Sequence, residues 1–401
     1  MLEISAQRFP KKLSVSLPLS KSILARQLVL DYIYDNPLAH RLDELEGSFL
    51  SDDIRYLAEA LKVLETRRNE KSKGAVSLYV GQSGTAYRFL SVLSLFEKAA
   101  VILNSDPQLT RRITIEDQAP FERIGGHIKF IPEENRTIIY PANRLEGTIG
   151  RESWGTSQYY SALLLTKRLH PVGLIIEIDC NSSSYSYIKL TEEVIREYNS
   201  GVVESEGDWS AAAYWYQLMA LHPEIEEICF ENLNPHSSQP DRELTKIYRQ
   251  FGIESNNENK ITRSGKLTNE LQIDLSQSLD LFPSLVLTAV FLAIPFEIFG
   301  ISNLRVKESN RIAAVLDNLK ALGVDNIVEH EDKLEWEPCA DVPRVTIDEV
   351  IPINSFGDHR IAMAFGVLGT SLEGKKLRIS ESECVAKSYP SFFKELLSYK
   401  S

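Results

Sequence analysis

Two kinds of helical pattern alternate along the chain. The first kind begins with small polar residues and is then apolar on nearly every side. It occurs six times, in residues 20–34, 83–96, 155–165, 207–221, 282–294 and 357–370. A helix that is apolar all round is a buried helix. We therefore expect six helices in the interior of the protein.

The second kind of helix is amphipathic and highly charged, which is typical of a helix that covers a core. It also occurs six times, in residues 52–68, 117–126, 191–201, 241–252, 309–323 and 392–400. Short runs rich in β-forming residues lie between the helices. They are residues 13–17, 76–80, 99–104, 174–179, 227–233 and 376–380.

The strict alternation of buried and surface helices predicts an α/β protein built from six repeats, each with the order β-α-β-α-β-β. Six such units of about 65 residues exceed one compact core, so two similar domains of three units each are expected. We place a discontinuous domain at residues 1–19 and 207–401. A second domain, residues 20–206, is inserted between its two parts.

Composition narrows the classes of partner. The chain has 401 residues, 43% of them hydrophobic, and a net charge of −12. This acidic balance argues against binding to nucleic acid or to an anionic membrane, which requires a basic face. Neither a Walker A loop nor a G-x-G-x-x-G fingerprint after a strand occurs, so nucleotide binding has no support. Small anions remain possible ligands.

The sequence also points to a cytoplasmic protein. The four cysteines, Cys180, Cys229, Cys339 and Cys384, lack the spacing of a zinc site or a disulfide framework, which fits a reducing compartment. The N-terminal stretch has no continuous apolar segment of a signal peptide. The most apolar run is interrupted by a proline and a glutamate, so it predicts a buried helix, a break and a buried strand.

Positive charge collects in one short stretch of this acidic chain. Residues 302–311 contain Arg305, Lys307 and Arg311 around a single carboxylate, Glu308. The apolar spacing that follows predicts a helix with Ser309 as its N-cap. Cations at a helix N-terminus are disfavoured unless an anion joins them, so this stretch indicates an anion site.

Similar polar groups open several of the predicted buried helices. One opening offers Lys21, Ser22 and Arg26, and another offers Gly84, Thr85 and Arg88. Thr156, Ser157 and Gln158 stand at a third opening, and His359 and Arg360 at a fourth. The stretch CVAKSYP adds Lys387. Taken singly, each has an ordinary explanation as a cap, an ion pair or an exposed side chain. Together they indicate one cleft that collects several anionic groups.

Carboxylates among these cations are candidates for acid–base chemistry. Glu308 lies inside the cationic stretch, and Asp280 precedes a buried helix, where its alternative role is that of a capping residue. Asp358 is expected to orient a neighbouring cation. Asp208 is expected to support the site or to serve only as a cap.

These motifs resemble the EPSP synthase (3-phosphoshikimate 1-carboxyvinyltransferase) family over nearly the whole chain. The matching pieces are SKS with the following arginine, SGTAYR, TSQ, EGD, the D-x-x-P-x-L at Asp280, RVKESNR, GDHR and AKSYP. The resemblance implies two similar domains, each of three βαβαββ units, in an inside-out α/β-barrel-like (EPT/RTPC-like) fold. It also implies phosphoenolpyruvate and shikimate 3-phosphate as substrates, and their dense negative charge would explain the cations.

The resemblance assigns binding roles to particular residues. Those expected to hold the phosphoenolpyruvate phosphate are Lys21, Gly84, Arg112, Gln158 and Lys387, while Arg311 and Arg360 would clamp its carboxylate. In shikimate 3-phosphate, the carboxylate would be held by Ser22 and Arg26. Its phosphate would be held by Thr156, Ser157, Ser184 and Tyr187. Its hydroxyls or phosphate would be contacted by Asn303 and Lys307. Supporting positions are Arg88, Asp208, Arg305, Asp358 and His359.

The same resemblance assigns the catalytic roles. Asp280 would accept the proton of the attacking 5-hydroxyl, and Glu308 or Lys21 would protonate the methylene carbon of phosphoenolpyruvate. Phosphate would then leave. No metal or organic cofactor is expected, and the resemblance favours a cytoplasmic monomer.

Two other functions stay open. The sister transferase that acts on UDP-N-acetylglucosamine typically uses a loop cysteine as its acid, and none of the four cysteines lies in a comparable loop. A catalytically silent anion-binding protein on the same scaffold would be expected to lack an acid–base residue, yet Lys21, Asp280 and Glu308 are all present.

Overall fold

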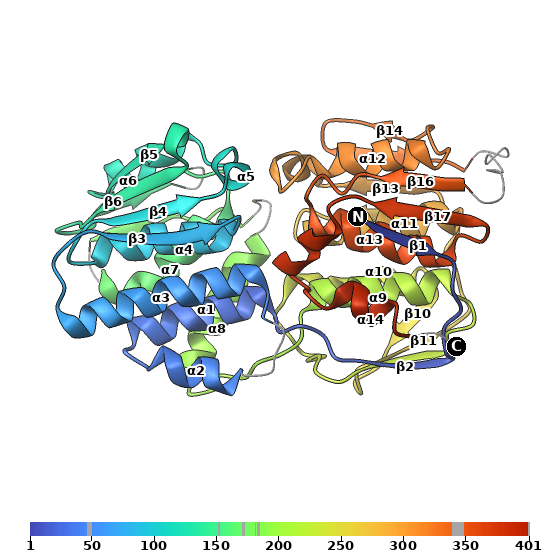
Figure 1. Ribbon diagram of the computed structural model, residues 1–401, viewed down its shortest axis with the longest axis horizontal. Helices are drawn as coiled ribbons and strands as arrows, with labels where there is room; N and C mark the ends of the chain where they lie inside the picture. The colour runs from blue at the N-terminus through green and yellow to red at the C-terminus, as the bar shows by residue number, and fades with distance from the viewer. Residues whose placement is uncertain are drawn as a thin grey trace. The chain divides into compact units, whose positions relative to one another are not determined.

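The computed structural model divides the chain into two compact units (Figure 1). Unit 1 comprises Met1–Ser20 and Glu206–Ser401, and unit 2 comprises Lys21–Ser205. The boundaries expected from the sequence differ from these by one residue at each crossing. The residues that the structure describes are 1–45, 50–150, 153–170, 173–180, 182, 185–338 and 349–399.

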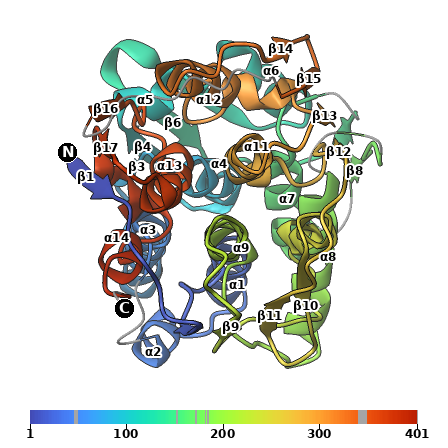
Figure 2. The same cartoon turned by 90° about the vertical axis from the view of Figure 1, so that its right-hand side faces the viewer.

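Three helices form the centre of unit 1. They are α9 (Trp209–Leu221), α11 (Phe282–Phe291) and α13 (His359–Ser371), and each packs against the other two. Figure 2 shows them nearly end-on, with the sheets of the unit around them. All three were predicted from their all-round apolar pattern, and their burial confirms that prediction.

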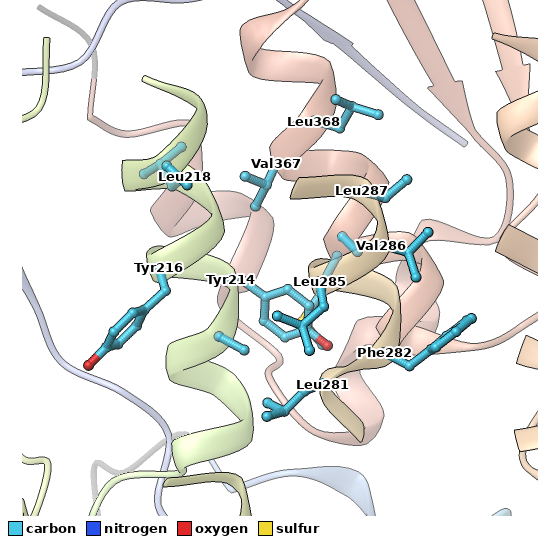
Figure 3. Packing of buried hydrophobic residues seen from close by; sticks show 14 of the residues in the cluster. Tyr214, Tyr216, Leu218, Leu281, Phe282, Leu285, Val286, Leu287, Val367 and Leu368 are labelled. Carbon is cyan, nitrogen blue, oxygen red and sulfur yellow. The ribbon is translucent and has the colours of Figure 1, made fainter. Parts of the chain in front are cut away.

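Side chains from all three helices meet in one hydrophobic core. Tyr214 of α9 faces Leu285 of α11, and Val367 of α13 lies further along the helices, between Leu218 and Leu287 (Figure 3). A polar contact also joins two of the helices, because the Gln217 side-chain amide donates to the carbonyl of Ala364 at 3.0 Å. The packing therefore fixes the ends of these helices, and with them the polar side chains at their N-terminal ends.

Three sheets cover this helical centre. The first has the strand order β10 (Ile253–Ser255), β11 (Lys260–Arg263), β9 (Glu227–Phe230), β2 (Lys12–Val15). The second has the order β12 (Leu271–Asp274), β13 (Phe296–Phe299), β15 (Lys333–Trp336), β14 (Val328–Glu329). The third has the order β1 (Leu2–Ser5), β17 (Lys375–Ile379), β16 (Glu349–Ile353).

The outer helical elements of unit 1 are short except for α12 (Arg311–Ala321). The others are η5 (Pro240–Glu243), α10 (Leu244–Arg249), η6 (Leu279–Leu281), η7 (Ser302–Val306), η8 (Ser382–Lys387) and α14 (Phe392–Leu396). One predicted cap is wrong. Asn310, rather than Ser309, caps α12, because its side chain accepts from the backbone N–H of Ala313 at 3.2 Å. The Ser309 hydroxyl donates to Asp358 instead, at 3.1 Å.

Unit 2 repeats the scheme with its own inner helices, α1 (Lys21–Ile33), α4 (Gly84–Leu93) and α7 (Ser157–Leu165). Its other long helices are α3 (Asp52–Glu70) and α8 (Tyr185–Asn199). The shorter helical elements are α2 (Leu38–Glu44), η1 (Ser94–Phe96), α5 (Pro107–Thr110), η2 (Ile115–Gln118), α6 (Ala119–Arg123), η3 (Pro132–Glu134) and η4 (Thr166–Leu169).

Two sheets accompany these helices in the described part of unit 2. One has the order β3 (Val76–Gly81), β4 (Val101–Ser105), β6 (Arg136–Tyr140), β5 (His127–Ile131), and the other pairs β7 (Gly147–Ile149) with β8 (Leu174–Ile176). Among the described residues, the three four-stranded sheets each have one parallel pair followed by two antiparallel pairs. This is the pairing that a β-α-β-α-β-β unit gives.

The chain leaves and re-enters unit 1 at neighbouring points. Leu19 forms a β-bridge with Gly207, and the Ser20 N–H donates to the carbonyl of Glu206 at 2.8 Å. The Gln239 side chain reinforces the junction by donating to the Gly207 carbonyl at 2.9 Å. The run from 282 to 301 forms a helix, a break and a strand, as predicted. Throughout the described chain, no helix combines the length and apolarity needed to cross a membrane.

Candidate active site

Arg311 is the centre of a buried ion network in unit 1. It is the first residue of α12, and its side chain is only 1% exposed. Its guanidinium donates to three carboxylates: Nε to Asp358 at 2.8 Å, Nη1 to Asp280 at 2.6 Å and Nη2 to Glu308 at 2.8 Å. A buried charge is tolerated only when it is paired in this way.

Two further cations complete the network. Arg360, in the first turn of α13, donates from Nη2 to Asp280 at 2.5 Å. Lys387, at the end of η8, lies 3.0 Å from Glu308 and is itself buried. Asp280 and Glu308 are each held between two cations. The structure thus brings together the predicted base, one predicted acid and three of the predicted cations.

The charges in this network act strongly on one another. Burial, the largest single influence, opposes ionisation of Asp280, but Arg360, Arg311 and then Lys307 outweigh it and hold the pKa of Asp280 well below its usual value. Burial likewise opposes the charge of Arg311, yet its carboxylate partners raise the pKa of the guanidinium further. Asp280 is therefore ionised and, in this arrangement, a weak base.

The predicted supporting residues of unit 1 occupy distinct places. Asp358 is fully buried and caps α13, because it accepts from the backbone N–H of Arg360 at 2.9 Å while it binds Arg311. His359 is buried beside it, with Nδ1 at 3.7 Å from the Asp358 carboxylate. Asp208 caps α9 by accepting from the Ser210 N–H at 2.8 Å.

The remaining residues of the cationic stretch divide into two groups. Lys307 follows η7 and acts on Asp280, while Asn303 lies half-buried within η7. Arg305, in contrast, contacts the hairpin of β14 and β15. Its guanidinium pairs with Glu329 and donates to the carbonyl of His330 at 2.9 Å. The contacts of Arg305 therefore stabilise the local fold around this stretch.

In unit 2, the α1 lysine has a partner that sequence reasoning missed. Lys21 begins α1, and its Nζ lies 3.0 Å from Asp53, a buried residue in the first turn of α3. The two residues are 32 positions apart. The pairing therefore cannot be predicted from neighbouring residues, although the two aspartates at 52 and 53 are typical of the first turn of a helix.

Several predicted anion ligands converge at the opening of α4. Arg88 donates from Nη1 to the side-chain oxygen Oε1 of Gln158 at 2.9 Å, and the side-chain nitrogen Nε2 of Gln158 donates to the Thr85 hydroxyl at 2.9 Å. A Cβ built on Gly84 would lie 2.8 Å from Arg88 Nη1, 3.6 Å from Arg112 Nη2 and 3.7 Å from Gln158 Oε1. Arg112 therefore faces this opening, whereas its neighbour Arg111 is exposed.

Arg26 is a buried cation surrounded by neutral groups. It donates to the Thr191 hydroxyl at 2.8 Å, to the Ser22 carbonyl at 2.6 Å and to the Tyr187 carbonyl at 3.0 Å. Burial lowers the pKa of Arg26 to about 10. None of these contacts is a carboxylate, so binding of an anionic ligand would stabilise the buried charge of Arg26.

The last predicted ligands lie near the start of α7. Thr156 caps the helix by accepting from the Gln158 N–H at 3.3 Å, and Ser157 is its first residue. The predicted ligand Ser184 lies outside the described residues, as does Cys339. Among the residues that are described, no group of three or more His, Cys, Asp or Glu side chains is placed to hold a metal ion.

Solved structures share this fold. The EPSP synthase from Acinetobacter baumannii aligns with a TM-score of 0.68 over 99% of this chain and 98% of that one, at 20% identity. The enolpyruvyl transferase NikO from Streptomyces tendae aligns with a TM-score of 0.64 over 99% and 96%, at 12% identity. The fold is thus that of the enolpyruvyl transferases.

Sequence relatives define the family more narrowly. A 3-phosphoshikimate 1-carboxyvinyltransferase from Dehalococcoides mccartyi is 31% identical over 383 residues, which is 90% of this chain and 87% of the relative. One from Bacteroides fragilis is 28% identical over 417 residues, covering 96% and 94%. Residues 197–396 match the model of EPSP synthase (3-phosphoshikimate 1-carboxyvinyltransferase). The chain belongs to the EPSP synthase family.

Proposed function

We propose that this protein transfers the enolpyruvyl (carboxyvinyl) group of phosphoenolpyruvate to the 5-hydroxyl of shikimate 3-phosphate and releases phosphate. The product is 5-enolpyruvylshikimate 3-phosphate, on the route to chorismate and the aromatic amino acids. The observation that carries the proposal is the buried network in which Arg311, Arg360 and Lys387 share the carboxylates of Asp280 and Glu308. Family membership supports the same reaction.

The network suggests how ligand binding prepares the reaction. Arg311 and Arg360 are assigned to the carboxylate of phosphoenolpyruvate, yet both are bonded to Asp280 in the resting protein. An incoming carboxylate competes for the same guanidinium groups, because it offers them the same forked hydrogen bonds. Each bond that passes from Asp280 to the ligand raises the basicity of Asp280. The substrate thereby activates the base.

The remaining groups are assigned by unit. In unit 2, Lys21, Arg112, Gln158 and the backbone at Gly84 serve the phosphate of phosphoenolpyruvate. The unit 2 groups assigned to shikimate 3-phosphate are Ser22, Arg26, Thr156, Ser157, Ser184 and Tyr187. In unit 1, Asn303 and Lys307 serve shikimate 3-phosphate, and Lys387 serves the phosphate of phosphoenolpyruvate.

The chemistry is an addition followed by an elimination. The 5-hydroxyl oxygen bonds to C2 of phosphoenolpyruvate as Asp280 takes the hydroxyl proton, and C3 gains a proton from Glu308 or Lys21. Loss of a C3 proton and of phosphate then restores the double bond. Positioned groups and fixed charges supply the catalysis. Lys387 and Arg311 hold Glu308 as an acceptor at rest, so Glu308 must take up a proton before it can act as the acid.

Phosphate release tests the reaction. The purified protein is given shikimate 3-phosphate and phosphoenolpyruvate together, and each is omitted in turn. We expect release only when both are present, and a fall of at least a hundredfold for Glu308→Gln, the scale of a lost general acid or base. A folded protein that releases no phosphate would contradict the proposal. UDP-N-acetylglucosamine as the acceptor, and then ligand binding without turnover, would be tried next.

We further propose a cytoplasmic monomer. The family resemblance favours a monomer, and the described cysteines Cys229 and Cys384 are free thiols, which suits a reducing compartment. Light scattering behind a size-exclusion column measures the mass directly. The expected value is close to the 45.4 kDa of one chain, and twice that mass would refute the monomer.

A further inference from the structure

A cluster of polar side chains is buried where helices α1, α7 and α8 of unit 2 pack together. Its members are Arg26 of α1, Ser161 of α7 and Thr191 of α8. Arg26 Nε donates to the Thr191 hydroxyl at 2.8 Å, and Arg26 Nη2 donates to the Ser161 hydroxyl at 3.4 Å. The two hydroxyl oxygens lie 2.9 Å apart. We call these three residues the inner polar cluster.

Each member of the inner polar cluster lies one helical turn beyond a residue assigned to shikimate 3-phosphate. The assigned residues are Ser22, Ser157 and Tyr187, in the first turns of α1, α7 and α8, and a cluster member follows each of them by four positions. Residues four positions apart lie on the same face of a helix. Arg26 Nη1 donates to the Ser22 carbonyl at 2.6 Å, and the Thr191 hydroxyl donates to the Tyr187 carbonyl at 2.8 Å. The cluster therefore connects three helix starts that carry assigned ligands.

Neutral groups hold Arg26 in place. Its nitrogens donate to hydroxyls and backbone carbonyls, and its guanidinium carbon lies 5.6 Å from the centre of the Phe89 ring of α4. A neutral acceptor fixes the direction of an N–H group without cancelling the charge of the guanidinium. Arg311 is held differently, because three carboxylates accept from it. Arg26 is thus fixed in direction and retains its charge for an anionic ligand.

Thr191 makes the contact that limits rotation of the Arg26 guanidinium. The Nε atom joins the guanidinium to its flexible stem, so a hydrogen bond at Nε restrains the whole planar group. The same Thr191 hydroxyl contacts the Ser161 hydroxyl of α7 and the Tyr187 carbonyl of α8. One hydroxyl therefore relates the direction of the cation on α1 to the positions of the other two helices.

We propose that Thr191, supported by Ser161, is a positioning residue that sets the spacing between the carboxylate and the phosphate of bound shikimate 3-phosphate. Arg26 is assigned to the carboxylate, whereas the starts of α7 and α8 are assigned to the phosphate. Because Thr191 joins Arg26 to both of these helices, it fixes one end of the ligand site relative to the other. The inference rests on the proposed function, since it takes shikimate 3-phosphate as the ligand.

Isothermal titration calorimetry with shikimate 3-phosphate tests the role of Thr191. Thr191→Val keeps the shape of the side chain and removes the acceptor of Arg26 Nε. We expect the Kd for shikimate 3-phosphate to rise about tenfold, the usual scale for a lost hydrogen bond to a charged group. Thr191→Ser retains the hydroxyl and should bind within about twofold of the natural protein. At saturating shikimate 3-phosphate, the KM for phosphoenolpyruvate should be unchanged in both variants.

A modified ligand distinguishes positioning from a purely structural role. The probe is shikimate 3-phosphate in which a hydroxymethyl group replaces the carboxylate. This probe gives Arg26 no anion to bind, so the natural protein and Thr191→Val should bind it with equal Kd. If Thr191→Val loses the same factor with both ligands, Thr191 supports only the fold of unit 2 and the inference fails.

Thr166→Val is the matched control. Thr166 is also buried in unit 2, and its hydroxyl donates to the carbonyl four positions earlier, that of Ala162, at 3.0 Å. Its other contacts are the Leu163 carbonyl and His170, so the control should bind shikimate 3-phosphate normally. Ser161→Ala should raise the Kd about threefold, because its bond to Arg26 is longer. If Thr191→Val does not fold, Ser161→Ala decides, and an unchanged Kd would overturn the inference.

Comparing binding with turnover separates this inference from the proposed reaction. A natural protein that releases phosphate, together with normal binding of shikimate 3-phosphate by Thr191→Val, would overturn the inference and leave the reaction standing. Weakened, carboxylate-dependent binding by Thr191→Val, in a protein that binds shikimate 3-phosphate without turnover, would support the inference and refute the reaction. A natural protein that does not bind shikimate 3-phosphate would refute both.

Discussion

Arg311 forms ion pairs with three carboxylates of unit 1. Each of the three nitrogens of its guanidinium donates to a different carboxylate, so one side chain joins Asp358, Asp280 and Glu308. Breaking a buried pair from one side typically costs about 3–5 kcal/mol. Substitution of Arg311 would therefore affect stability and activity together. Substitutions of residues that contact a ligand-binding group are more informative, because such a side chain can be altered without leaving several charges unpaired.

Asp53 is such a position. Asp53→Asn removes the charge that holds the Lys21 ammonium 3.0 Å away, and Lys21 is assigned to the substrate phosphate. We expect kcat/KM for phosphoenolpyruvate to fall about tenfold, equivalent to about 1.4 kcal/mol, because the lysine is no longer held in one position. Steady-state kinetics with phosphoenolpyruvate as the varied substrate measures the change.

Asp52→Asn is the matched control for this change. Asp52 lies in the same first turn of α3, so both substitutions remove one favourable charge from the helix N-terminus, but Asp52 pairs with Arg55. The control should keep normal kinetics. Equal kinetics for the two variants would show that Asp53 does not position Lys21.

Gly84 tests the opening of α4. In Gly84→Ala, the new methyl group would lie 2.8 Å from Arg88 Nη1, so the Arg88 side chain must move and its bond to Gln158 is disturbed. We expect KM for phosphoenolpyruvate to rise about tenfold or more. The free energy of unfolding should change by less than about 1 kcal/mol, because alanine has a higher helix propensity than glycine and offsets part of the strain. Gly74→Ala, where a methyl group meets nothing within 4 Å, should leave KM unchanged. An unchanged KM for Gly84→Ala would remove this opening from the binding site.

At the scale of elements, helix starts bring the functional groups to fixed positions. Side chains cap the described inner helices α4, α7, α9 and α13 by accepting from backbone N–H groups. The capping residues are Ser83, Thr156, Asp208 and Asp358. The residues just after each cap then lie at the N-terminal end of the helix, where the helix dipole favours an anionic ligand.

The corrected cap of α12 gives a test at this scale. Asn310→Ala removes the acceptor for the Ala313 N–H and should lower the free energy of unfolding by about 1 kcal/mol. Ser309→Ala keeps the cap and loses one hydrogen bond to Asp358, so it should change stability less. Urea titration of both variants measures the difference. A larger loss for Ser309→Ala would show that the cap is not at Asn310.

The sequence predicted these elements because their signals are local. Apolar positions on every side of a helix, and a capping residue before it, are visible within about a dozen residues. The pairs Lys21 with Asp53 and Ser210 with Asp241 were missed because each joins residues 31 or 32 positions apart. No periodicity connects such positions. The charges of the site could be predicted, whereas their partners depended on how the helices pack.

At the scale of the whole chain, unit 1 draws together distant segments around α13. Gly366 and Gly369 of α13 lie against Ile4 of β1, and Gly366 also meets Phe393 of α14. A Cβ on Gly366 would lie 2.5 Å from the Phe393 ring and 3.4 Å from the Ile4 side chain. These two glycines let the helix approach segments near both ends of the sequence.

Gly366→Ala tests this close packing. The added methyl group improves helix propensity by about 1 kcal/mol, but overpacking of a filled core costs about 1–3 kcal/mol and occasionally more. Because an approach of 2.5 Å puts the cost at the upper end of that range, we expect a net loss of about 2 kcal/mol in the free energy of unfolding. Adding Phe393→Leu should recover part of that loss, since it shortens the side chain that the methyl group meets. Unchanged stability in the single variant would mean that α14 is not held against α13.

The pairing of β1 with β17 also bears on how the protein is made. Glu3 and Arg378 are partners across these strands although they lie 375 positions apart in the sequence. At about 5–20 residues per second, a ribosome needs roughly 20–75 seconds between them. Unit 2 is contiguous, so all its strands are synthesised within that interval. During this time the apolar Ile4 of β1 has no β17 strand to pair with. Synthesis thus imposes an order of assembly in which β1 is made long before its partner β17.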